Sequence, residues 1–154
     1  MSKYTNKEHA VASADFCDDD YCFACGTKNP AGLRLRFVIE GDTVFTDFCL
    51  PDEYQGWAGV VHGGILTLIM DEVQVNAAAA RGYIAPTAEI TSRLLAPVRT
   101  NAPYRAGARI TEIRRDRLIL TEAQITDPAG TVCCRSSARL IVTDRADPSA
   151  MRLK

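Results

Sequence analysis

The spacing of apolar positions along the chain separates β-strands from one helix. Apolar and polar residues alternate at 33–39 and again at 43–50, with a tight turn between the two segments, which predicts a β-hairpin. From Gly63 to about Arg81 the apolar residues cover nearly the whole circumference of a helical wheel, and a glycine follows as a stop signal. This segment is therefore expected to be a buried helix. Strand-like patterns return after it at 86–98, 103–113, 117–126 and 131–143.

One long buried helix among strands that are joined by short hairpins predicts an α+β domain, in which an antiparallel β-sheet curls around a single central helix. Three regions are expected: an N-terminal arm at residues 1–21, the domain at residues 22–143 and a flexible C-terminal tail at residues 144–154. The length of 154 residues suits one domain rather than two.

Composition and charge argue against several classes of function. The net charge of −1 at pH 7 provides neither a basic footprint for nucleic acid nor a polybasic patch for a membrane surface. No apolar run approaches the roughly 18 residues that are needed to span a bilayer, and the N-terminus lacks the apolar core of a signal peptide. We therefore expect a cytoplasmic protein without nucleic-acid partners or membrane insertion, whose six cysteines are reduced thiols.

Two of the cysteines, Cys22 and Cys25, form a C-x-x-C pair, and Cys17 stands five residues before it. Such a pair is one half of many zinc sites, but a structural zinc site normally has four ligands. The sequence contains no second C-x-x-C pair, and His9 is the one nearby histidine. The expectation is a packed loop with small thiols, with no metal ion and no cofactor.

The buried helix carries two narrow polar stripes. At 100° per residue, Thr67, Asp71 and Gln74 fall within about 60° of one another, while Glu72 and Asn76 fall together roughly a third of a turn away. A buried carboxylate without a partner costs several kcal/mol, so such a group is either paired or used for chemistry. A structural role, as a loop cap or an ion pair with an arginine, accounts for Asp71 as well as chemistry does, and it is the better explanation for Glu72.

His62, Gly63 and Gly64 stand at the start of the helix, where the first backbone N–H groups have no partner within the helix and the helix dipole favours negative charge. This is a suitable place to hold a developing oxyanion, although the glycines are also consistent with a tight turn. Gly63 and Asp71 are separated by ~12 Å along one helix, too far to act on one carbonyl group. If both act on it, they must come from two chains related by a two-fold axis.

The segments "VVHGGILTLIMDE" and "CFACGTKNPAGLRLRF" resemble motifs of the hotdog-fold acyl-CoA thioesterases, in particular the PaaI-like branch, over about residues 22–142. The resemblance implies hydrolysis of an acyl-CoA thioester by a homodimer or a dimer of dimers. It implies that His62 shapes the site, that the Gly63 N–H polarises the carbonyl, that Asp71 activates water or attacks as a nucleophile, and that Thr87 lies near the water. We expect the substrate to contact four further residues: Gly64, Thr67, Gln74 and Gln55.

The chain departs from the family pattern at one position. Some relatives have Asn or Gln six residues before the motif histidine, whereas this chain has Gly56 there and Gln55 beside it. Two other functions use the same fold: a non-catalytic acyl-CoA binder or sensor, and a hydratase or dehydratase acting on acyl thioesters. The presence of Asp71 argues against the sensor, and the spacing of His62 and Asp71 does not match the hydratase pattern. Neither the acyl group nor the residues that bind the CoA phosphates follow from the sequence.

Overall fold

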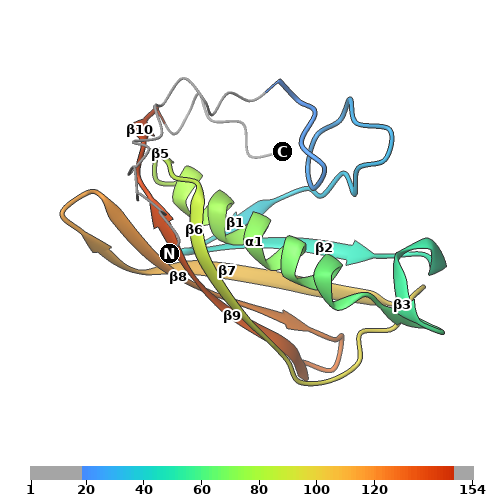
Figure 1. Ribbon diagram of the computed structural model, residues 1–154. Coiled ribbons are helices and arrows are strands. Elements are labelled where there is room, and N and C mark those ends of the chain that lie inside the picture. Colours follow the sequence, from blue (N-terminus) through green and yellow to red (C-terminus); the bar gives the residue numbers. More distant parts are fainter. Residues whose placement is uncertain (1–18, 148–154) are drawn as a thin grey trace, which may run out of the picture.

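A computed structural model describes residues 19–147 and shows a six-stranded antiparallel sheet that wraps around one long helix (Figure 1). The helix α1 spans Gly63–Ala79. The sheet has the strand order β1-β2-β7-β8-β9-β6, and every neighbouring pair is antiparallel. Its strands are β1 (Val38–Glu40), β2 (Thr43–Cys49), β6 (Thr87–Leu94), β7 (Pro103–Arg114), β8 (Leu118–Thr126) and β9 (Val132–Ile141).

Short elements connect the helix to the sheet. The 3-10 turn η2 (Asp52–Tyr54) leads into a small hairpin of β3 (Gln55–Trp57) and β4 (Val60–Val61), which ends directly before α1. After the helix, β5 (Tyr83–Ile84) pairs with β10 (Asp144–Arg145). None of the helices within residues 19–147 is long and apolar enough to cross a membrane.

The core forms where the helix meets the concave face of the sheet. Ile69, Met70 and Val73 of α1 are completely buried, as are Ile119 and Ile125 of β8. Burial alternates along β8 and β9, because successive side chains of a strand point to opposite faces of the sheet. The predicted architecture, an antiparallel sheet curled around one central helix, is confirmed, and the arrangement is the hotdog fold.

The prediction for the first strand was wrong in its extent. Residues 33–37 alternate as a strand does, but only Val38–Glu40 pairs with the sheet. The amides of Leu33 and Leu35 instead donate to the carbonyls of Phe23 and Ala24, at 2.8 and 2.9 Å, so the upstream loop takes the place of a neighbouring strand. The alternating sequence pattern matches the alternating burial of these side chains, but the segment forms its hydrogen bonds with the preceding loop rather than with a strand of the sheet.

The predicted boundaries of the domain fall partly outside the described residues. Residues 1–18 of the expected arm and 148–154 of the expected tail lie there. Within the described part, Asp144 and Arg145, which the sequence analysis assigned to the tail, are paired with β5. Arg145 also donates to the Asp116 carboxylate at 2.9 Å, so ordered structure extends beyond residue 143.

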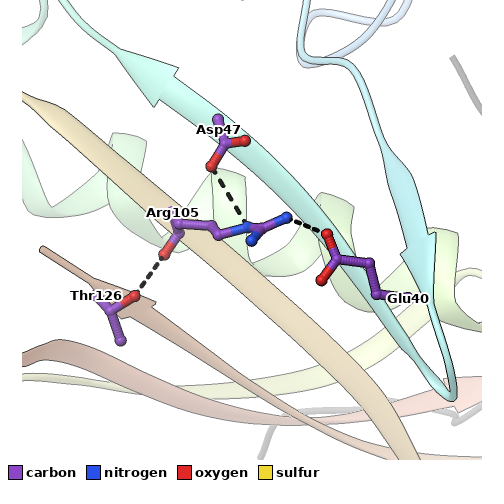
Figure 2. Close-up of polar contacts among 4 residues, drawn as sticks. All are labelled: Glu40, Asp47, Arg105 and Thr126. Carbon is purple, nitrogen blue, oxygen red and sulfur yellow. Dashed lines mark hydrogen bonds and ion pairs between the residues drawn. The ribbon is translucent and has the colours of Figure 1, made fainter. Parts of the chain in front are cut away.

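On the outer face, Arg105 of β7 connects three strands (Figure 2). Its guanidinium donates to Glu40 of β1 at 2.6 Å, lies 3.4 Å from Asp47 of β2, and stacks over the Phe45 ring at 4.3 Å. The Thr126 hydroxyl of β8 donates to the Arg105 carbonyl at 3.4 Å. These contacts hold the β1–β2 edge of the sheet against β7 and lie on the face opposite α1.

Gln74 was expected to contact the substrate, but it belongs to the core. It is completely buried, and its amide nitrogen donates to the Met70 carbonyl at 3.0 Å and to the Ser136 hydroxyl at 2.8 Å. Its amide oxygen accepts from the Thr121 hydroxyl at 2.8 Å. The side chain therefore fastens α1 to β8 and β9, and both N–H donors of its amide are used within the core.

Replacing Gln74 with Leu should destabilise the fold without a comparable loss of ligand binding. The hydroxyls of Ser136 and Thr121 would remain buried without their partner, and each such group costs about 1–3 kcal/mol. We expect the free energy of unfolding, measured by urea denaturation, to fall by at least about 2 kcal/mol. The triple variant that also carries Ser136→Ala and Thr121→Val should recover part of this loss, and no recovery would contradict the network.

Candidate active site

His62 ends the loop before α1 and caps the helix. Its backbone is extended (φ −60°, ψ 132°), and its Nδ1 accepts a hydrogen bond from the Gly64 amide at 2.9 Å. Since Nδ1 is the acceptor, the neutral ring carries its proton on Nε2. The His62 carbonyl accepts from the amides of Ile65 and Leu66, at 3.0 and 3.2 Å. Three of the first four amides of the helix are therefore already engaged.

The amide of Gly63 is the remaining one, and it has no acceptor among residues 19–147. An unengaged N–H at the first position of a helix, where the dipole places partial positive charge, is suited to a carbonyl oxygen that gains negative charge. The capping by His62 thus leaves the amide of Gly63, rather than that of Gly64, without an acceptor among residues 19–147. The expected substrate contact of Gly64 cannot use its amide, because His62 occupies it.

Asp71 lies two turns further along α1 and is half-buried. Its Oδ1 accepts a 2.6 Å hydrogen bond from the hydroxyl of Thr87, the first residue of β6. Its Oδ2 has no hydrogen-bond partner within the described part of the chain, and no cationic side chain forms an ion pair with the group there. The structural ion pair that the sequence left open for Asp71 is therefore absent from residues 19–147. Thr87, which was expected near the water, holds the carboxylate itself.

The other expected site residues form hydrogen bonds to groups other than Asp71. The Thr67 hydroxyl donates to the Gly63 carbonyl at 3.1 Å, one turn away on the same helix. The Gln55 side chain accepts from the Gly59 amide at 3.0 Å and so braces the β3–β4 hairpin. Gly56 packs on His62 so closely that a Cβ on Gly56 would lie 3.1 Å from the His62 ring. The Gln55 oxygen is therefore engaged within its own hairpin, and the polar contact that the resemblance implies at this position stays a prediction.

Two large apolar side chains close to the start of α1, Leu94 and Trp57, are exposed. Leu94, at the end of β6, is 53% exposed, yet its Cδ1 would lie 2.6 Å from a Cβ on Gly63. Trp57, in the hairpin before His62, is 82% exposed. Strand β6 lies at the edge of the sheet and alongside the helix (Figure 1), so its outer hydrogen-bonding groups have no neighbouring strand among residues 19–147. Such an edge is normally covered or paired.

Glu72, beside Asp71, faces a different environment that the sequence analysis missed. Its two oxygens each lie 3.8 Å from the Cys22 thiol, and the Asn76 amide donates to it at 3.3 Å. Burial raises the pKa of the Cys25 thiol well above its ordinary value, and the neighbouring Glu72 carboxylate raises it further. The stripe of Glu72 and Asn76 therefore meets the C-x-x-C loop, while Asp71 meets β6. The sequence contained two signals for this cluster, the C-x-x-C pair and the stripe of Glu72 and Asn76, but no local pattern indicated that the two meet.

Comparison with known protein families gives one match. A model described as the thioesterase superfamily matches residues 58–136, which include His62, α1 and β6. None of the curated proteins matches the chain.

Several solved structures share the fold. The thioesterase superfamily protein RHA08564 is 25% identical, with a TM-score of 0.75 over 87% of this chain and 70% of that one. The smu.793 protein of Streptococcus mutans, solved bound to acetyl CoA, is 16% identical, with a TM-score of 0.68 over 73% of this chain and 91% of that one. The PaaI protein from the phenylacetic acid degradation operon of E. coli is 13% identical, with a TM-score of 0.68 over 74% and 83%. The likeness to the last two shows the fold.

Proposed function

The chain belongs to the thioesterase superfamily, and from that premise we propose that it hydrolyses an acyl-CoA thioester to the free acid and CoA. One observation carries the proposal: a single helix presents an unengaged amide at Gly63 and a half-buried carboxylate at Asp71 whose one oxygen is fixed by Thr87. Thioester hydrolysis requires an oxyanion donor and a base or nucleophile, and these groups supply both. A cytoplasmic location remains a prediction.

In the proposed reaction a water molecule attacks the thioester carbonyl carbon, and the free oxygen of Asp71 takes the proton of that water. The carbonyl oxygen becomes an oxyanion, which the Gly63 amide stabilises at the positive end of the helix dipole. Collapse of the tetrahedral intermediate breaks the carbon–sulfur bond, and the CoA thiolate leaves and takes up the proton. In an alternative route Asp71 attacks the carbonyl itself and water then hydrolyses the resulting anhydride, with the same two groups in place.

We further propose that the site is shared between two chains. Gly63 and Asp71 of one chain are ~12 Å apart along α1, whereas one carbonyl group needs both within hydrogen-bond distance. Two helices that run antiparallel across a two-fold axis bring Gly63 of each chain to Asp71 of the other, and this creates two equal sites. The uncovered edge of β6, with exposed Leu94, supports an interface on this side of the domain.

A panel of acyl-CoA thioesters tests the activity, with aryl-acetyl, benzoyl-type and medium-chain substrates first. Loss of the thioester absorbance in the ultraviolet is the better readout, because the chain's own six cysteines interfere with thiol reagents. We expect turnover of at least one of these substrates. Micromolar binding of several acyl-CoA thioesters without turnover of any would overturn the proposal and favour the non-catalytic sensor.

Thr87→Val should separate positioning from binding. Valine keeps the branched shape but removes the hydroxyl that donates to Asp71, and a hydrogen bond to a charged group contributes about 1.5–3 kcal/mol. We expect kcat to fall by about ten- to a hundredfold, with a much smaller change in KM, since a misplaced carboxylate affects mainly the transition state. Thr87→Ser, which retains a hydroxyl, serves as the matched control and should stay within about threefold of wild type by the same hydrogen-bond argument.

A further inference from the structure

The loop that carries Cys22 and Cys25 is joined to α1 through a cluster of three side chains. The thiols of Cys22 and Cys25 and a carboxylate oxygen of Glu72 all lie within 4.8 Å of one another. The two cysteines come from the loop before β1, and Glu72 comes from the third turn of α1. The expectation of no metal rested on cysteines and histidines alone: Cys22 and Cys25 provide two ligands, and Cys17 and His9 lie outside the residues that the structure describes. The fold supplies a third ligand from a position 47 residues after Cys25.

From this geometry we infer that Cys22, Cys25 and Glu72 bind one zinc ion. Zinc binds sulfur at about 2.3 Å and carboxylate oxygen at about 2.0–2.2 Å, and a tetrahedral angle between these bonds puts the two atoms about 3.5–3.7 Å apart. The observed separation of the Cys22 sulfur from each Glu72 oxygen is 3.8 Å. Closing the cluster on an ion therefore needs only a small movement of side chains. Two thiolates favour zinc over the hard cations calcium and magnesium.

The backbone holds the two thiols in place before any ion arrives. The amide of Gly26 donates to the Cys22 carbonyl at 2.8 Å and closes the C-x-x-C turn. A Cβ on Gly26 would lie 2.5 and 2.6 Å from backbone atoms of Cys22, so no other residue fits without moving the turn. The hydrogen bonds from Leu33 and Leu35 to Phe23 and Ala24 anchor the two residues between the cysteines. A preformed donor pair loses less conformational freedom when it binds an ion.

Charge also favours a cation at this place. Glu72 is half-buried, and no Lys, Arg or His of residues 19–147 forms an ion pair with it. Its one conventional hydrogen-bond donor is the neutral Asn76 amide. Two thiolates and a carboxylate carry three negative charges, of which a divalent cation neutralises two. Because zinc is normally four-coordinate, these three donors leave a fourth position for water or another ligand. The ion would fasten the loop to the turn of α1 that also carries Asp71. Because this role is structural, the inference does not depend on thioester hydrolysis.

Elemental analysis and metal titration of the reduced full-length chain test this inference. We expect about one zinc per chain after purification without chelator, and recovery of one equivalent when the stripped protein is titrated against a competing chromophoric chelator. Glu72→Gln and Cys25→Ser should each weaken zinc binding at least about tenfold, the scale on which even outer-shell changes act at metal sites. Cys49→Ser removes an exposed cysteine of β2 outside the cluster and is the matched control, with unchanged zinc content and affinity.

Cobalt provides a readout that is independent of zinc content. Cobalt(II) bound by two thiolates gives an intense thiolate-to-metal charge-transfer band, which Cys25→Ser should reduce and Cys49→Ser should leave intact. The inference is overturned if the reduced wild type binds neither metal, or if Cys22 and Cys25 form a disulfide and their reduced form takes up no zinc. It is also overturned if Glu72→Gln binds zinc within twofold of wild type, because the third ligand would then be misassigned.

Discussion

Asp71→Asn is expected to lower kcat for the best acyl-CoA substrate by at least about a hundredfold, while substrate binding changes little. Asparagine has nearly the same shape and still accepts the hydrogen bond from Thr87, but its amide neither takes a proton from water nor attacks a carbonyl. Loss of a positioned base typically costs about 10²–10⁴ in rate. Because the substrate pocket keeps its shape, a Kd measured by calorimetry should stay within about threefold, a shift of under 1 kcal/mol.

Asp42→Asn is the matched control for this variant. It makes the same chemical change at an exposed position between β1 and β2, where Asp42 accepts, within the described part of the chain, only from the neighbouring Thr43 hydroxyl. Wild-type kcat is expected for it. An Asp71→Asn enzyme that kept more than about a tenth of the wild-type rate would contradict the base or nucleophile role, since that loss is below the range for general-base catalysis.

The arrangement of helix and sheet was predictable because it depends on local periodicity. Apolar residues cover nearly the whole circumference of α1, which predicted a buried helix, and the strand-like segments on either side of it in the sequence predicted the sheet. The predicted helix start at Gly63 was confirmed, since His62 provides a cap and the two glycines follow it. The ends of the strands were less predictable. Residues 33–37 alternate between apolar and polar as a strand does, but the amides of Leu33 and Leu35 donate to a loop whose path no local sequence pattern describes.

The sequence also predicted that Asp71 and Glu72 lie on different stripes of α1. It did not predict which part of the fold each stripe contacts. A helical wheel gives angles on one helix and does not say which angle faces the sheet. Gln74 and Asp71 are about 60° apart on the wheel, and the boundary between core and site falls between them. Gln74 bonds to Ser136 and Thr121, and Glu72 meets Cys22, all across 47 residues of chain or more. Such pairings depend on the assembled fold.

Gly63→Pro is expected to lower kcat by about 10²–10³-fold, the usual cost of losing one oxyanion donor. Proline at the first position of a helix removes the N–H without breaking the helix, because that amide has no helical acceptor. The preceding residue must be extended, and His62 already is, at φ −60° and ψ 132°. Gly63→Ala adds the same Cβ against Leu94, whose exposed side chain has room to rotate, but keeps the N–H.

The contrast between these two variants isolates the hydrogen-bond donor from the added bulk. Gly63→Ala is expected to lose much less activity than Gly63→Pro, with both variants retaining the helical circular-dichroism signal of wild type. Equal losses in the two would assign the effect to the Cβ and would remove Gly63 from the proposed oxyanion site.

Combining the two inactive variants in one dimer tests whether the site is shared between chains. Purified heterodimers of an Asp71→Asn chain and a Gly63→Pro chain, selected with two different affinity tags, contain two kinds of site if each site draws Gly63 from one chain and Asp71 from the other. One site then has both defects, while the other has an intact Gly63 and an intact Asp71, so a two-fold axis predicts about half of the wild-type rate per dimer. If each chain instead uses its own Gly63 and Asp71, every site in the heterodimer contains one defect. The rate then stays as low as in the parent homodimers, and that outcome would rule out the shared site.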